Sequence, residues 1–202
     1  MRDGTAVRYA QDVRWCGVAQ RDLGEGWHVI EEGLNGRTTV RDDMCHLDTN
    51  LNGIRALPML LEAHKPLDAI VIMLGTNDVL PLLGLTPSET AANLARIMRD
   101  ARKIRPSIPI LLVSPPAPSP AAIDWEVGMH GGNRDVLGAS QAEALAAAAQ
   151  KEGAAFLDAR ESVPAFGAGD GFHLTVEEHK KLGLAVGSAL RKLLEINARG
   201  AC

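Results

Sequence analysis

A carboxylate and an imidazole lie three residues apart in the segment Asp170-Gly171-Phe172-His173. At this spacing Asp170 can accept a hydrogen bond from the imidazole and fix its tautomer, which leaves the other ring nitrogen to act as a general base. The alternative interpretation is a polar turn that precedes a helix. The tetrapeptide alone does not choose between acid–base chemistry and a turn.

A second polar segment, Gly75-Thr76-Asn77-Asp78, directly follows an apolar run. Its glycine permits a sharp exit from a strand, and the amide of Asn77 can then donate a hydrogen bond to an oxyanion. An Asx-turn at Asn77 and Asp78 is the alternative interpretation. In an open parallel sheet, ligands gather beyond the carboxyl ends of the strands, so a polar segment at such an end is a candidate for chemistry.

None of the seven serines is predicted to be a nucleophile. Ser140 follows Gly-Ala, but it lacks a preceding strand and pairs with Glu143 as a predicted capping box. Ser88 belongs to the first turn of a predicted helix. Ser114 does follow a predicted strand, but the two prolines after it remove backbone donors that an oxyanion hole would need.

Other kinds of site find little support in the sequence. No His, Cys, Asp and Glu residues stand at metal-ligand spacing, and no glycine-rich phosphate loop is present, so neither a metal nor an organic cofactor is predicted. A net charge of -4 and 3% aromatic residues disfavour nucleic acid as a partner. The three cysteines form no disulfide pattern, which favours a cytoplasmic location. The longest apolar run, residues 69–74, is too short to cross a membrane.

Short apolar runs alternate with segments of helical period along the whole chain. The predicted strands are residues 27–31, 68–74, 108–113 and 154–157. Helices are predicted from the cap Asp12 to Leu23, over residues 51–64, from the cap Thr86 to Pro106, over residues 141–150, and from the cap Thr175 onward. This alternation predicts an α/β fold with a parallel sheet, as a single domain over residues 1–202.

Five ordered segments resemble the SGNH, or GDSL-type, hydrolases, in particular their branch of small arylesterases and acyltransferases. These segments are residues 12–15, 29–39, 73–78, 113–116 and 170–175. The resemblance implies a three-layer α/β/α sandwich with a flavodoxin-like parallel sheet. It also implies that Gly33 and Asn77 donate to the oxyanion, that Asp170 and His173 are the catalytic acid and base, and that the substrate is a small-molecule ester.

One block of that family has no counterpart in the sequence, namely the strand that runs into Gly-Asp-Ser-Leu and carries the nucleophile. We therefore expect an N-terminally truncated domain that lacks the first, central strand, with residues 1–11 as the exit loop of that strand. As it stands, the chain is expected to be inactive. The alternative is a non-catalytic descendant that binds a small ligand or a protein partner. The sequence does not determine the oligomeric state, and a homo-oligomer is one of the possibilities.

Overall fold

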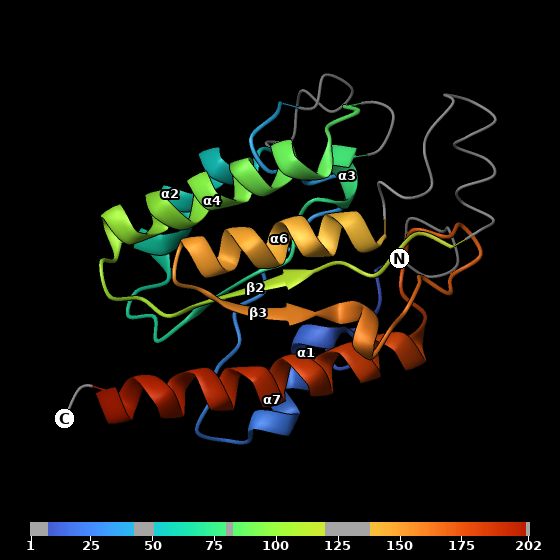
Figure 1. Cartoon of the computed structure of the whole chain (residues 1–202). Coiled ribbons are helices and arrows are strands. Elements are labelled where there is room, and N and C mark those ends of the chain that lie inside the picture. Colours follow the sequence, from blue (N-terminus) through green and yellow to red (C-terminus); the bar gives the residue numbers. More distant parts are fainter. Residues whose placement is uncertain (1–7, 43–50, 80–82, 120–137, 201–202) are drawn as a thin grey trace. The chain divides into compact units, whose positions relative to one another are not determined.

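Helices and strands alternate along the chain, and the structure, a computed structural model, has the predicted α/β fold with a parallel sheet (Figure 1). It describes residues 8–42, 51–79, 83–119 and 138–200, without the side chains of 197–200. Most of the predicted exit loop, residues 1–7, lies outside this description. The elements are α1 (Trp15–Leu23), α2 (Gly53–Ala63), β1 (Ile70–Ile72), α3 (Thr76–Val79), α4 (Pro87–Ile104), β2 (Ile110–Ser114), α6 (Ala139–Lys151), β3 (Ala155–Asp158), the 3-10 helix η2 (Ala159–Glu161) and α7 (Val176–Gly200).

The chain divides into two compact units. The first unit comprises residues 1–31, 116–134 and 157–202, and the second comprises residues 32–115 and 135–156. Of the residues discussed above, Asp170 and His173 belong to the first unit, whereas Gly33 and Asn77 belong to the second.

The second unit contains β1, β2, the first two residues of β3 and a large apolar cluster. The strand order is β1-β2-β3, and β1 runs parallel to β2 with Ile70 opposite Ile110 and Ile72 opposite Leu112. Parallel strands need crossover connections, which α4 supplies between β1 and β2, and α6 between β2 and β3. All five residues of β2 are buried, as predicted for a strand that is covered on both faces. The fully buried side chains of the cluster include Leu94, Met98, Leu112 and Leu145.

The predicted capping box at the start of α4 is confirmed. The Thr86 hydroxyl accepts from the backbone N–H of Glu89 at 3.2 Å, and the Glu89 carboxylate accepts from the N–H of Thr86 at 2.8 Å. By contrast, α6 does not begin with the predicted capping box of Ser140 and Glu143. Its N-cap is Gly138, which has no side chain to offer, and the helix begins one residue before Ser140.

In the first unit, α1 packs along α7 (Figure 1). The contact depends on a glycine, since a Cβ atom built on Gly183 would lie 2.5 Å from the Cβ of Val18. Beside this close approach, Leu182 and Val186 are buried, and Arg191 pairs with the Asp22 carboxylate at 2.6 Å. The apolar face and the ion pair together attach α1 to the last helix.

The predicted strand at residues 27–31 is wrong for the described structure, which shows no ladder there. Instead, the side-chain amide of Gln20 donates to the Trp27 carbonyl and accepts from the Val29 N–H, both at 2.5 Å. This amide takes the two hydrogen bonds that a neighbouring strand would otherwise make. The alternation of the sequence predicted an extended backbone, but a strand also needs a partner.

Helix α1 begins after Arg14 rather than after the predicted cap Asp12, and Arg14 makes no side-chain cap. The first-turn N–H of Trp15 donates instead to Nδ1 of His179 on α7, at 3.1 Å. The Tyr9 ring packs edge-on against this imidazole, with centroids 5.4 Å apart. His179 therefore packs between α7 and the segment at Tyr9, and it caps α1 from another helix.

We expect acidification to destabilise the protein through His179. Burial, assisted by positive groups that include Arg14, lowers the pKa of His179 from 6.5 to about 4. The unfolded chain binds the proton more readily, so the free energy of unfolding falls as the pH drops from 6.5 towards 4. The measurement is the Tm against pH for the wild type and for His179→Gln, whose amide oxygen can accept from Trp15 but does not titrate. If Tm fell equally steeply with pH in the wild type and in His179→Gln, His179 would not be the group responsible.

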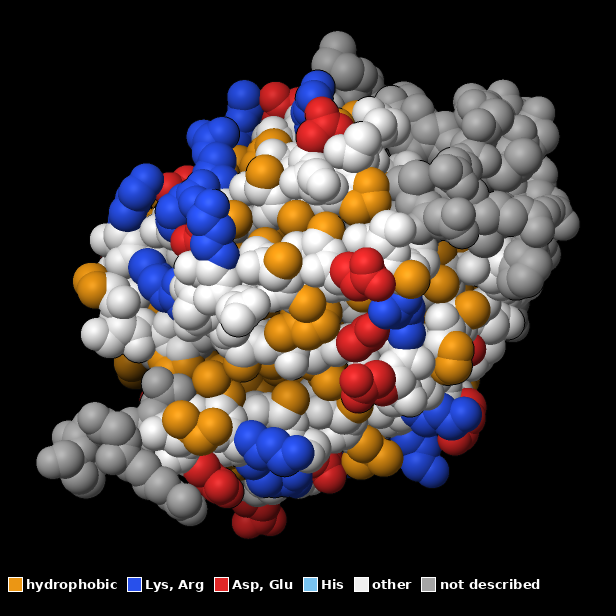
Figure 2. Space-filling view, viewed as in Figure 1, with side chains coloured by type: hydrophobic (Ala, Val, Ile, Leu, Met, Phe, Trp, Pro, Cys, Tyr) orange, Lys and Arg blue, Asp and Glu red, His pale blue; other side chains and the backbone are white. Residues whose placement is uncertain are grey.

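Lys and Arg side chains gather at the upper left of the view, with a few Asp and Glu side chains among them (Figure 2). Arg99 pairs with Glu152 and Lys103 pairs with Asp100, both at 2.7 Å. Exposed pairs of this kind contribute about 0–1 kcal/mol each, so they mainly keep this face soluble and of mixed charge. Within the described residues, no helix combines the length and the apolar character that a membrane span requires.

Candidate active site

The structure brings Asp170 and His173 into direct contact in the first unit. Nδ1 of His173 lies 2.7 Å from Oδ2 of Asp170. The other carboxylate oxygen, Oδ1, accepts from the backbone N–H groups of Phe172 at 2.9 Å and of His173 at 3.1 Å. The turn thus aims one oxygen at its own backbone and the other at the imidazole.

These contacts determine which nitrogen of His173 can act as a base. Burial alone raises the pKa of the Asp170 carboxyl, but the N–H of Phe172 and the His173 side chain outweigh it and hold this pKa below its ordinary value. Asp170 is therefore an ionised acceptor at neutral pH, and Nδ1 of His173 carries the proton. This tautomer leaves the lone pair on Nε2, the nitrogen that a general base uses.

Backbone hydrogen bonds hold the loop that carries this pair. The N–H of Ala168 donates to the His173 carbonyl at 3.1 Å, and the N–H of Ser119 donates to the Gly171 carbonyl at 3.0 Å. At the start of the loop, Phe166 donates to the Ala117 carbonyl at 2.8 Å. The loop is therefore anchored both within itself and to the segment that follows β2.

In the second unit, Asn77 lies on the one-turn helix α3, directly after β1. Its side-chain amide donates to the Arg37 carbonyl at 3.0 Å. An amide has two N–H groups, so the second one can face an oxyanion while the first holds the side chain in place. The bond links the segment at Asn77 to the segment that begins at Gly33.

A second link joins the same two segments through the buried carboxylate of Asp78. Both oxygens accept from the backbone N–H of Thr39 at 3.1 Å, and Oδ1 also accepts from the Thr39 hydroxyl. Burial raises the pKa of Asp78, and the bonds from Thr39 oppose this rise. The sequence analysis missed this pair, because its members lie 39 residues apart.

The two glycines singled out in the sequence differ in what the structure demands of them. Gly75 has a φ of +121°, and a Cβ atom there would lie 2.8 Å from Nε2 of Gln141 and 3.0 Å from Cγ2 of Thr90. The turn after β1 therefore requires glycine. Gly33 is exposed, and a Cβ atom on it would meet nothing within 4 Å. Its predicted role as an oxyanion donor stays a prediction.

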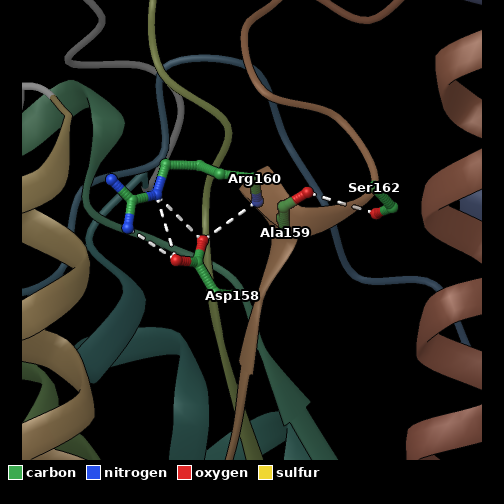
Figure 3. Close-up of polar contacts among 4 residues, drawn as sticks. All are labelled: Asp158, Ala159, Arg160 and Ser162. Carbon is green, nitrogen blue, oxygen red and sulfur yellow. Dashed lines mark hydrogen bonds and ion pairs between the residues drawn. The ribbon is translucent and has the colours of Figure 1, made fainter.

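All seven serines lie among the described residues. Ser114 is buried in β2, and Ser88 and Ser140 are exposed in the first turns of α4 and α6. Ser162 donates to the Ala159 carbonyl at 3.1 Å (Figure 3). Within the described part of the first unit, no hydrogen bond joins His173 to a serine hydroxyl.

A further polar pair, which the sequence analysis did not single out, ends β3 in the first unit (Figure 3). The Arg160 guanidinium donates to both oxygens of Asp158, with Nη2 at 2.6 Å from Oδ2 and Nε at 3.0 Å from Oδ1. The backbone N–H of Arg160 donates to the same carboxylate at 3.0 Å. The carboxylate balances the guanidinium charge, so the pair fixes the turn into η2.

Among the described residues, no three His, Cys, Asp or Glu side chains lie close enough together to hold a metal ion. Acid–base chemistry at Asp170 and His173 needs none. A carboxylate–imidazole pair of this geometry is the acid–base part of a catalytic triad.

Comparisons with known proteins identify the family. The model of the GDSL-like lipase/acylhydrolase family matches residues 3–181, and the chain belongs to this family, whose other name is SGNH. Among curated sequences no match is found. The solved structures that match the chain over most of their length include the following three. One of them is 56% identical with a TM-score of 0.83, and covers 95% of this chain and 89% of its own.

The other two structures are those of named esterases. Est24, a carbohydrate acetylesterase from Sinorhizobium meliloti, is 34% identical with a TM-score of 0.84, and the match covers 94% of this chain and 90% of Est24. The inhibitor-bound aryl esterase of M. smegmatis is 34% identical with a TM-score of 0.85, and the match covers 96% of this chain and 92% of that chain. The chain is thus an SGNH esterase homologue, close to aryl esterases and carbohydrate acetylesterases.

Proposed function

We propose that this chain supplies the base, the acid and the oxyanion donors of a carboxylic ester hydrolase or acyltransferase that acts on small esters. The observation that carries the proposal is the 2.7 Å contact between Nδ1 of His173 and the Asp170 carboxylate, in a member of the SGNH family. Asp170 orients the imidazole and stabilises its protonated form. Gly33, through its backbone N–H, and Asn77, through its amide, are the oxyanion donors in this proposal.

The reaction needs a serine nucleophile, which we assign to a Gly-Asp-Ser-Leu segment outside these 202 residues. Nε2 of His173 takes the hydroxyl proton as the serine oxygen attacks the ester carbonyl. The tetrahedral oxyanion collapses, the alkoxide leaves with the proton from His173, and an acyl-enzyme remains. Water, or another alcohol, then gives its proton to His173 and attacks the acyl carbon, and the serine oxygen leaves with the proton that His173 returns.

The substrate class follows from the relatives. The two named structures are an aryl esterase and a carbohydrate acetylesterase. Acetyl esters of phenols and of sugars are therefore the substrates to test first. The experiment is hydrolysis of p-nitrophenyl acetate by the chain carrying a Gly-Asp-Ser-Leu segment, with His173→Ala as the matched control. Activity that depends on His173 supports the function, and activity indifferent to His173 contradicts it.

The second candidate function is ligand or partner binding by a non-catalytic descendant of such a hydrolase. The observation that favours it is the burial of Ser114 in β2 and the position of Ser88 and Ser140 in the first turns of helices, where none of the three follows the nucleophile pattern. Addition of a Gly-Asp-Ser-Leu segment distinguishes the two candidates. A hydrolase gains turnover when the segment is added, whereas a non-catalytic descendant does not.

Residues 1–202 alone are expected to show no serine-dependent hydrolysis of p-nitrophenyl acetate. Loss of the nucleophile from a catalytic triad costs about 10⁶-fold in turnover. The assay compares the purified chain with Ser114→Ala and Ser140→Ala, the two serines nearest to the required pattern. Sustained turnover that either substitution abolishes would show that the chain contains its own nucleophile.

A further inference from the structure

The loop that carries Asp170 and His173 is closed at its base by one carboxylate. Oε2 of Glu178, in the first turn of α7, accepts from the backbone N–H of Thr175 at 2.8 Å and from that of Gly167 at 3.0 Å. Gly167 and Thr175 bracket the catalytic pair in the sequence. A single side chain thus joins the start of the loop to its end.

The packing around Gly167 shows how closely the carboxylate is seated. A Cβ atom built on Gly167 would lie 2.5 Å from Oε1 and 3.0 Å from Oε2 of Glu178. Gly167 is itself exposed, so burial does not enforce this contact. The charge-assisted hydrogen bond from its N–H is what holds the residue against α7.

Helix capping explains only part of this arrangement. The N–H of Glu178 donates to the Thr175 hydroxyl at 3.3 Å, which together with the 2.8 Å bond makes the predicted capping box. A capping box accounts for the bonds between Thr175 and Glu178. It does not account for the bond to Gly167, which lies 11 residues before Glu178.

We infer that Glu178 is a positioning residue for the acid–base pair, which deepens the proposed function and rests on it. The physical route is short, because Ala168, the neighbour of Gly167, donates to the His173 carbonyl at 3.1 Å. Release of Gly167 therefore removes one attachment of the segment that bonds the His173 backbone, while the bond from Phe166 to Ala117 remains. The contact between His173 and Asp170 then opens more often.

The test is the solvent exchange, measured by NMR on residues 1–202, of the Nδ1 proton of His173 and of the Gly167 amide. Loss of a hydrogen bond to a charged group in Glu178→Ala is expected to speed both exchanges by about 10- to 100-fold. Glu178→Gln keeps an acceptor oxygen and is expected to restore most of the protection. The matched control is Thr175→Val, which removes the hydroxyl of the capping box and leaves the Gly167 bond in place.

Exchange of the His173 proton that is unchanged in Glu178→Ala would overturn the inference. Equal acceleration in Thr175→Val would also overturn it, because capping alone would then explain the effect. The readout needs no turnover, so it separates this inference from the proposed function. If the chain carrying a nucleophile segment proved inactive while Glu178→Ala still exposed the His173 proton, only the function would fail.

Discussion

Residues 1–202 joined to an N-terminal segment of about 15–20 residues, one apolar strand that ends in Gly-Asp-Ser-Leu, are expected to hydrolyse p-nitrophenyl acetate. The expected rate is about 10⁶-fold above that of the same chain with Ala in place of the added serine, because that serine is the nucleophile. The measurement is the initial rate at equal protein concentration. A folded extended chain with no turnover would favour the non-catalytic descendant.

The added strand is also expected to stabilise the fold. Burial of about five apolar side chains contributes roughly 1.5–3 kcal/mol each, on the order of 10 kcal/mol in total. The Tm of the extended chain should therefore exceed that of residues 1–202, and the serine-to-alanine control should share this gain. An unchanged Tm would mean that the added segment does not join the sheet.

The second unit offers an edge on which such a strand can pair. Among the described residues, β1 pairs with β2 alone and forms an edge of the three-stranded sheet. Yet residues 69–74 are continuously apolar, the pattern of a strand with neighbours on both sides and helices on both faces. An apolar edge of this kind is a template for pairing.

The first unit carries a similar signature at residues 27–31. This segment has the alternation of a strand, and the side chain of Gln20 bonds the Trp27 carbonyl and the Val29 N–H in place of a neighbouring strand. The sequence predicted the backbone shape from local alternation. It could not predict the absence of a ladder, because a strand forms only if a partner is present.

Local signals in the sequence predicted the elements that depend on neighbours along the chain. The capping boxes at Thr86 and Thr175 and the buried strand β2 are of this kind. The predicted cap of α6 was wrong, because the helix begins at Ala139 with Gly138 as its N-cap. A local pattern locates a helix end only to within one or two residues.

The same distinction holds at the candidate site. The contact of Asp170 with His173 spans three residues, so the sequence could offer it as one of two interpretations beside a polar turn. The bonds of Thr39 to Asp78 and of Gly167 to Glu178 span 39 and 11 residues. No local pattern indicates them, because folding brings their members together.

In the extended chain, His173→Ala is expected to remove nearly all activity, by about 10⁶-fold, because no other side chain is assigned to accept the serine proton. Asp170→Asn is expected to cost about 10⁴-fold, since an amide can no longer hold the imidazole in the tautomer that leaves Nε2 unprotonated. The measurement is kcat with p-nitrophenyl acetate, with the Tm of each variant as a control for folding.

Asn77→Ala is expected to leave a folded enzyme that is slower by about 10²–10³-fold, the usual cost of one oxyanion donor. It also removes the 3.0 Å bond to the Arg37 carbonyl, so a fall in Tm must be measured beside the fall in kcat. Leu184→Ala, at an exposed position of α7, is the matched control and should change neither. A graded series, with His173 first, Asp170 next and Asn77 last, is what a base, its orienting acid and one of two oxyanion donors produce. If neither His173→Ala nor Asn77→Ala changed the kcat of an active extended chain, the active site would lie elsewhere on the same fold.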